Sequence, residues 1–232
     1  LLILLFVHFT ANTFLKAIVL LFTLKKFPPN DQHHPPTIGY GKHLSLMGIL
    51  GPISQQVDKI LIFHFLGPVQ VAVYTFALRP IRELKKPLQS LNQLALPKLS
   101  QRDLGKLRHS LPGKMIKMLA ILAPVAAAYI LVAPYFYQWV FPQYIEATTY
   151  SQVFALSLLL FPKMLMSQTL TAHAQTKRLY VLRISTPLLK IILLGTLLPL
   201  YGLWGGIYAL LATEIFNALL LFSVFPWGKK SS

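Results

Sequence analysis

The sequence predicts an all-α integral membrane protein, a helical bundle of about seven transmembrane helices. Two observations lead to this fold class. Of the 232 residues, 55% are hydrophobic and 12% are charged, whereas soluble domains carry about 25% charged residues. Seven apolar stretches also reach the length of about 20 residues that a helix needs to cross the hydrocarbon core. The chain contains no cysteine, which excludes a disulfide framework and a thiolate metal site.

The apolar stretches follow one another along the chain with short connectors, which predicts antiparallel neighbouring helices. A polar segment with four prolines, residues 28–36, separates the first stretch from the others and is predicted to be a linker. The chain starts inside an apolar run without an initiator Met, so we expect a fragment whose N-terminal part is missing. The seven stretches are residues 1–24, 44–66, 70–97, 115–139, 147–173, 179–199 and 202–225.

The connectors alternate in charge along the chain. Four of them hold thirteen lysines and arginines together, and the three between them hold none. By the positive-inside rule, the basic connectors are expected to be cytoplasmic, so Leu1 starts outside and Ser232 ends inside. The basic connectors are residues 25–43, 98–117, 174–178 and the C-terminal tail, and the others are near residues 67–69, 140–146 and 200–201.

The stretch 70–97 carries charged residues in its middle, and we nevertheless predict one spanning helix, kinked at Pro80 and Pro87. A loop at its centre would leave two flanks of about ten residues each, which are too short to span as helices. At about 100° per residue, the polar residues fall on one stripe, and only Lys85 points elsewhere. The stripe consists of Thr75, Arg79, Arg82, Glu83, Lys86, Ser90 and Gln93.

Two interpretations of this stripe stay open. In the first, Arg79, Arg82 and Lys86 form the cationic wall of a water-filled cavity that receives an anionic substrate. In the second, the same residues make interhelical ion pairs, with Glu83 neutralising Arg79 or Lys86. The first is favoured because one glutamate cannot neutralise four cations.

Other predicted helices contribute isolated bases, of which Lys59, Lys163 and Lys190 are candidates for the same cavity. Within the seven stretches, and with Lys117 counted in the basic connector 98–117, nine basic residues stand against three acids, Asp58, Glu83 and Glu214. Such an excess suits a phosphate or diphosphate group, because lysine and arginine donate several hydrogen bonds to its oxygens. The net charge of +16 is therefore assigned to the membrane interior and the cytoplasmic connectors, and no nucleic-acid partner is expected.

Four residues, Asp58, Glu83, Glu214 and Asn217, are candidates for coupling or gating. Asp58 either pairs with another helix or lines the lumen. Glu214 and Asn217, three positions apart, either bind a coupling cation or make interhelical hydrogen bonds, and the second is favoured. No nucleophile–base–acid arrangement, glycine-rich phosphate loop or zinc motif is present, so we predict no enzyme, cofactor or metal.

Three motifs resemble a known family. They are Asp58-Lys59-Ile60-Leu61 followed by Phe65-Leu66-Gly67-Pro68 and Val73-Tyr74-Thr75-Phe76-Ala77; Ala95-Leu96-Pro97-Lys98-Leu99-Ser100; and Gly202-Leu203-Trp204-Gly205-Gly206-Ile207-Tyr208. Together they resemble the polysaccharide-export flippases, the lipid-linked oligosaccharide branch of the multidrug/oligosaccharidyl-lipid/polysaccharide superfamily.

The resemblance implies a fold of two similar lobes, related by an axis along the membrane normal. Residues 1–27 would then be the last helix of the N-terminal lobe, 28–43 a cytoplasmic inter-lobe linker, 44–226 a six-helix C-terminal lobe and 227–232 a cytoplasmic tail. The glycines of the last motif are expected to allow a tight turn and close helix packing.

The resemblance also implies a function. It predicts a flippase in the bacterial cytoplasmic (inner) membrane that translocates an undecaprenyl-diphosphate-linked oligosaccharide, an O-antigen or capsule/exopolysaccharide unit, by alternating access. Its partners would be this anionic lipid-linked substrate, membrane lipids, the missing N-terminal lobe and the glycan polymerase machinery. The alternatives are a drug/cation antiporter of the same superfamily, which the excess of buried bases argues against, and a membrane scaffold, which leaves the charged stripe unexplained.

Overall fold

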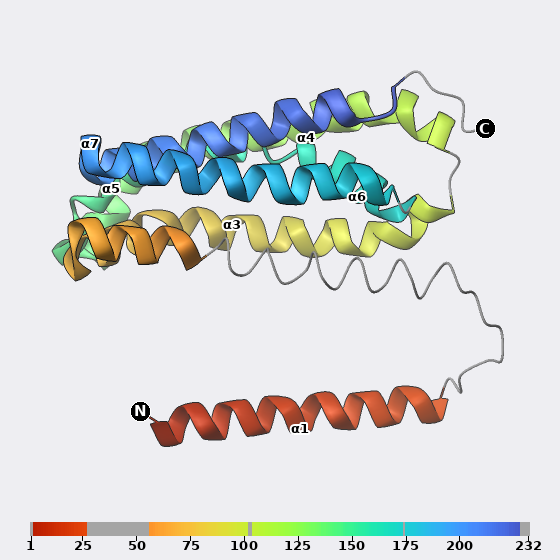
Figure 1. Ribbon diagram of the computed structural model, residues 1–232, viewed down its shortest axis with the longest axis horizontal. Coiled ribbons are helices and arrows are strands. Elements are labelled where there is room, and N and C mark those ends of the chain that lie inside the picture. The colour runs from red at the N-terminus through yellow and green to blue at the C-terminus, as the bar shows by residue number, and fades with distance from the viewer. Residues whose placement is uncertain (1, 27–55, 102–103, 174, 228–232) are drawn as a thin grey trace. The chain divides into compact units, whose positions relative to one another are not determined.

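The computed structural model describes residues 2–26, 56–101, 104–173 and 175–227, and every regular element within these ranges is helical (Figure 1). The chain divides into two compact units, Leu1–Gly39 and Tyr40–Ser232. In the first unit, α1 (Leu2–Lys26) is a helix of 25 residues, which confirms the helix predicted over residues 1–24. The expected linker and residues 44–55 of the second apolar stretch lie outside the described residues.

The second unit is a bundle of antiparallel helices. A helical segment over residues 56–66 ends at Gly67, whose φ of 86° allows the chain to turn directly into the next helix. The elements that follow are α3 (Pro68–Ser100), α4 (Leu104–Val140), a 3₁₀ turn (Pro142–Tyr144), α5 (Ala147–Ala155), a second 3₁₀ turn (Leu156–Leu158), α6 (Lys163–Ala172) and α7 (Thr176–Val224).

The charged stretch after Gly67 forms one helix, α3, as predicted, and stays helical through Pro80 and Pro87. With 33 residues α3 is about 50 Å long, and with 37 residues α4 is about 55 Å long. The prediction of a connector over 98–117 is wrong for most of that range, because α3 continues to Ser100 and α4 begins at Leu104. Hydropathy locates the membrane edge, whereas lysine, arginine and leucine are good helix formers beyond that edge.

The stretch predicted over residues 147–173 consists of two helical pieces that are bent against each other and could together form one span. The chain bends by 52° between the segment 147–158 and α6. Pro162 lies at the break and has no backbone N–H to donate. Hydrogen bonds there span three residues instead of four, as from Phe161 N to Leu158 O at 3.1 Å. The break places Lys163 at the first position of α6, inside the bundle.

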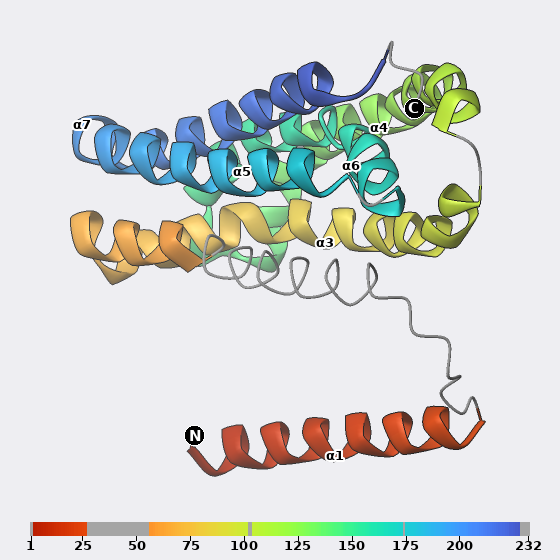
Figure 2. The ribbon, with the colours of Figure 1, turned by 45° about the vertical axis from the view of Figure 1, so that its right-hand side comes forward.

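The last element, α7, is a helical hairpin rather than a straight helix. Its backbone leaves the helical region at Gly202, where φ is 57° and ψ is −138°, a conformation that is essentially restricted to glycine. Figure 2 shows the two limbs, residues 176–201 and 203–224, running side by side from this turn. The structure therefore confirms the two helices predicted over 179–199 and 202–225.

The glycines after this turn allow the close approach that was predicted for them. A Cβ atom at Gly205 would lie 2.0 Å from the carbonyl oxygen of Leu197 in the other limb. Further along the hairpin, the Asn217 side-chain amide donates to the Thr186 hydroxyl at 2.8 Å. Arg178 donates to the carbonyl oxygen of Val224 at 3.0 Å. These contacts keep the two limbs in register.

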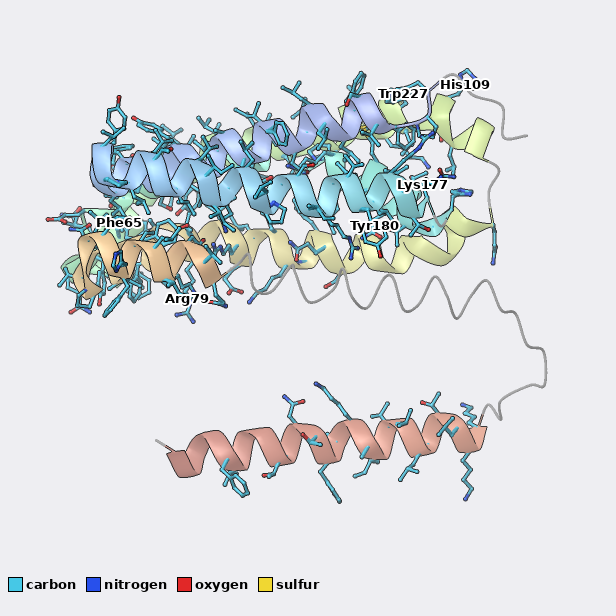
Figure 3. The ribbon with its side chains drawn as sticks, viewed as in Figure 1. Phe65, Arg79, His109, Lys177, Tyr180 and Trp227 are labelled. Atoms are coloured by element: carbon cyan, nitrogen blue, oxygen red, sulfur yellow. The ribbon has the colours of Figure 1, made fainter. Side chains whose placement is uncertain are left out.

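The connectors lie at alternate ends of the bundle. Figure 3 shows Phe65, next to the turn at Gly67, at one end and His109, Lys177 and Trp227 at the other. Of the basic segments, the connector between α3 and α4 and the start of α7 thus share one end, as the charge pattern predicted, whereas residues 27–43 and 228–232 lie outside the described residues. By length and composition, two helices could cross a membrane, His109–Val140 and Thr176–Val224, and the bent pair 147–158 and Lys163–Ala172 could form a third span.

The packing of the bundle alternates between apolar and polar layers. The larger apolar cluster lies toward the Gly67 and Gly202 turns and includes Ile62, Tyr74, Leu78, Ile81, Tyr137, Phe154, Leu194 and Leu210. The smaller lies toward the basic end and includes Leu111, Met166, Leu170, Leu179, Leu182, Leu221 and Phe225. Along α7, Lys190 and Glu214 come between residues of these two clusters, and Lys85 of α3 and Lys163 of α6 lie near them, which makes a polar layer inside an otherwise apolar bundle.

Candidate functional site

A cavity of about 440 Å³ lies in the polar layer, between α3, α5 and both limbs of α7. Four bases and one acid are among the residues that line it. These residues are Arg82, Lys85, Lys86, Gln89, Phe154, Thr186, Lys190, Leu210, Thr213 and Glu214. A second hollow of about 230 Å³ shares Lys85, Gln89 and Glu214 with the cavity and adds Ser157, Lys163, Ser167 and Asn217, among others.

One face of α3 supplies four residues of the cavity wall, at spacings i, i+3, i+4 and i+7 from Arg82. This face is rotated from the predicted stripe by about half of the 100° step between helical residues. The structure therefore corrects the position of Arg79, which is exposed and lies on the side of α3 away from α7 (Figure 3). Glu83 is exposed as well, whereas Arg82 and Lys86 line the cavity as predicted.

Lys85 is the residue that the stripe excluded and that the structure places at the centre of the site. Its ammonium donates to the Ser157 hydroxyl at 2.8 Å and lies 5.2 Å from the centre of the Phe154 ring. The signal that could have found it is the row Tyr74, Leu78 and Ile81, which is fully buried. Lys85 continues that row at i+4 after Ile81, so it extends the buried face of α3.

Asp58 is fully buried at the start of the described part of the helix before α3 and binds three other side chains. The Tyr74 hydroxyl donates to its Oδ2 atom at 2.7 Å, and the same atom lies 3.5 Å from Arg82 and 3.4 Å from Lys190. Its Oδ1 atom accepts the backbone N–H of Lys59 at 3.0 Å. Of the two alternatives left open for Asp58, the structure thus shows pairing with other helices.

The Lys59 side chain takes no part in the wall of either hollow and is half-buried. Lys190 is buried, lines the cavity and also contacts Asp58. Of the three isolated bases that were predicted to line the cavity, Lys163 and Lys190 thus reach the polar layer and Lys59 does not.

A second ion pair joins α6 to the second limb of α7. Lys163 forms a salt bridge with the Glu214 carboxylate and donates to the Glu214 carbonyl oxygen at 2.8 Å. Asn217 lines the smaller hollow and bonds to Thr186. Glu214 and Asn217 thus make interhelical contacts, the alternative that was favoured. In the described ranges, no group of three or more His, Cys, Asp or Glu residues is placed to hold a metal ion.

Glu83 pairs with Lys86 at 2.7 Å on the exposed part of α3. This contact lies within α3, so it is not the interhelical pair of the second interpretation, but Arg82 does pair with Asp58 of the preceding segment and also lines the cavity. Both arrangements are therefore present together. Within the cluster, five bases (Arg82, Lys85, Lys86, Lys163 and Lys190) stand against three acids (Asp58, Glu83 and Glu214). The cluster carries two more positive than negative charges, and in an apolar bundle such an excess calls for water or an anion.

The profile of a family described as polysaccharide biosynthesis protein matches residues 4–149, which is more than half of the chain. The chain belongs to the polysaccharide biosynthesis protein family. The match confirms the resemblance that the motifs indicated and includes Asp58, Tyr74 and the cavity face of α3. Lys163, Lys190 and Glu214 lie beyond the residues that the family profile covers. No curated protein and no solved structure matches the chain.

Proposed function

We propose that the protein is a membrane flippase that translocates an undecaprenyl-diphosphate-linked oligosaccharide across the bacterial cytoplasmic membrane. The single observation that carries this proposal is the cationic cavity inside an apolar helical bundle of a polysaccharide biosynthesis protein. Polysaccharides are assembled from units attached to a lipid diphosphate, which has to cross a membrane before its sugar can be used outside. The chemistry of such a headgroup and the chemistry of the cavity are complementary.

The charge of the headgroup supports this assignment. A diphosphate diester carries one negative charge on each phosphate, and the cluster has a surplus of two positive charges. Lysine and arginine donate charge-assisted hydrogen bonds to phosphate oxygens. The cavity volume of about 440 Å³ is within the range of about 300–1,000 Å³ that is typical of small-molecule sites.

The depth of the cavity fits a site that is reached from the cytoplasmic leaflet. Lys190 and Glu214 each lie twelve residues from Gly202, so they are about 18 Å from the turn in a hydrocarbon core of about 30 Å. Lys86 and Gln89 lie further toward the basic end, which by the positive-inside rule is cytoplasmic. In the proposed assembly, a second lobe forms the other wall, and opening alternates between the two membrane faces.

The antiporter alternative would need acids that are available to protons, sodium or organic cations. Two acids of the cluster, the buried Asp58 and the half-buried Glu214, are already paired with bases, Asp58 with Arg82 and Lys190 and Glu214 with Lys163. The excess of positive charge further disfavours a cationic substrate. The flippase is therefore the function that the geometry supports better.

The proposal is tested by complementation in two bacterial strains. The intact protein is expected to restore surface glycan in a flippase-null bacterium, and the double change Arg82→Gln and Lys190→Gln is expected to abolish this at unchanged membrane levels. The matched control is Arg79→Gln, which removes a base from the exposed side of the same helix. Restoration of drug resistance in a pump-null strain, without restoration of glycan, would instead support the antiporter.

A further inference from the structure

The contact between Asp58 and the cavity bases carries an inference that rests on the proposed function and extends it. We propose that Asp58 is an internal counter-ion, which pairs with Arg82 and Lys190 while the cavity holds no anion. When an anionic headgroup enters the cavity, both bases leave Asp58 and bind the headgroup. Asp58 is thus a residue that sets affinity and couples binding to helix movement, without itself contacting the substrate.

The geometry places the two bases between two competing acceptors. Arg82 and Lys190 both line the cavity, and both contact the same atom of Asp58, at 3.5 and 3.4 Å. A strong charge-assisted bond from nitrogen to a carboxylate oxygen measures about 2.7–2.9 Å. The exposed pair of Lys86 with Glu83 reaches 2.7 Å. The bases on Asp58 are therefore held by long contacts, which a diphosphate in the cavity can replace with shorter ones.

The Asp58 carboxylate keeps hydrogen-bond donors when the bases leave it. The Tyr74 hydroxyl donates to the atom that the bases share, at 2.7 Å, and the Lys59 backbone N–H donates to the other oxygen at 3.0 Å. A buried carboxylate that lost every donor would be strongly destabilised. Tyr74 therefore makes the exchange feasible, and its position on the buried row of α3 keeps it in place.

The exchange changes the links between three elements. Asp58 lies on the helical segment before Gly67, Arg82 on α3 and Lys190 on the first limb of α7. When the bases turn to the headgroup, the ionic tie between this segment and α7 is released. Headgroup binding and the breaking of the Asp58 ion pairs are thermodynamically linked. Headgroup binding therefore favours the arrangement with broken ion pairs, and that arrangement raises the affinity for the headgroup by the same free energy. Anion binding thus loosens the bundle where the segment before Gly67 meets the first limb of α7.

The test measures equilibrium binding of two lipids to the intact protein in nanodiscs, undecaprenyl diphosphate and the neutral undecaprenol. Asp58→Asn is expected to bind the diphosphate about five- to tenfold more tightly, because its bases are already released. Tyr74→Phe changes no charge but removes the hydroxyl that donates to Asp58, so Asp58 holds Arg82 and Lys190 more strongly. This variant is expected to bind the diphosphate about threefold more weakly. Undecaprenol binding stays the same in both variants.

The control is Glu146→Gln, the same loss of one carboxylate at an exposed position in the connector between α4 and α5. It is expected to bind both lipids as the wild type does. Unchanged or weaker diphosphate binding by folded Asp58→Asn would show that Asp58 only supports the fold. If Asp58→Asn does not fold, Tyr74→Phe decides, and unchanged or tighter binding by this variant overturns the proposal.

Failure of the proposed function gives a different result. A wild-type protein that binds undecaprenyl diphosphate no more tightly than undecaprenol rejects the flippase assignment and the counter-ion together. A wild type that prefers the diphosphate, with an Asp58→Asn variant that shows the same preference, rejects the counter-ion alone.

Discussion

At the scale of single residues, the position of Lys85 shows which face of α3 lines the cavity. A lysine flanked by charged neighbours on a polar stripe is expected to reach solvent. Lys85 instead continues a buried apolar row, where a hydroxyl and an aromatic ring accept its ammonium. A cation in such surroundings is partly desolvated, so it interacts strongly with any anion that enters the cavity. Lys85 also lines both hollows, as Gln89 and Glu214 do, whereas Arg82 and Lys86 line only the larger one.

We expect Lys85→Met to weaken diphosphate-lipid binding about tenfold, the effect of one charge-assisted hydrogen bond. Methionine preserves most of the length and apolar volume of the lysine stem, so the fold should be retained. Arg79→Met, on the exposed side of α3, should change the affinity by less than twofold. Binding measurements in nanodiscs with both variants provide the comparison. Equal losses for the two variants would mean that the predicted stripe, rather than the cavity face, binds the anion.

At the scale of elements, the breaks in the helices decide which charges can meet. The bend at Pro162 brings Lys163 to the start of α6, where it reaches Glu214. The turn at Gly202 folds α7 on itself, so that Lys190 and Glu214, 24 positions apart, line one cavity. Both breaks depend on residues with special backbone properties, proline without an N–H and glycine with a positive φ.

The hairpin of α7 predicts a contrast between two glycines. Gly205→Ala would place a Cβ atom 2.0 Å from a backbone oxygen of the other limb, so the limbs must separate, at a cost of about 1–3 kcal/mol. Gly195→Ala meets no atom within 4 Å and should stabilise the first limb by up to about 1 kcal/mol, since alanine is the better helix former. Thermal unfolding in detergent measures both. A Gly205→Ala variant as stable as the wild type would show that the limbs are not closely packed at this point.

At the scale of the whole molecule, the bundle has an apolar exterior around the polar layer. Large apolar side chains such as Leu131, Trp139, Leu188 and Leu200 are exposed on its surface, as expected where lipid replaces water. Aromatic side chains gather near the connectors, where Phe76 stacks on Tyr144 and Trp204 on Tyr208. Tyrosine and tryptophan are enriched at membrane–water interfaces. The apolar surface and the distribution of charged residues therefore both indicate a membrane protein.

The orientation of this bundle is tested with single cysteines, since the chain has none. Gln101→Cys, at the basic end, should resist a membrane-impermeant thiol reagent in intact cells and react once the cells are opened. Gln143→Cys, in the connector without bases, should react from outside. Both positions are exposed, so access of the reagent depends on the side of the membrane alone. Labelling of Gln101→Cys in intact cells would reverse the orientation and place the candidate site nearer the outer leaflet.

The sequence by itself determined the helical class, the order of most helices, the alternation of the connectors and the turn at Gly202. These features depend on local properties: apolar length, loop charge and glycine conformation. The same local reasoning failed at the ends of α3 and α4 and at Pro162. Helix formation continues beyond the membrane edge, and a single proline can either be absorbed, as Pro80 is in α3, or break the helix.

Only the tertiary structure decided which charges form the site. A helical wheel groups residues by angle, but the angle that faces the interior depends on the helices that pack against it. In α3, packing rotated the inner face toward Lys85 and away from Arg79. The partners of Asp58 come from positions 16, 24 and 132 residues further along the chain. No local pattern specifies such pairs, because they arise from the packing of the segment before Gly67 against α3 and the first limb of α7.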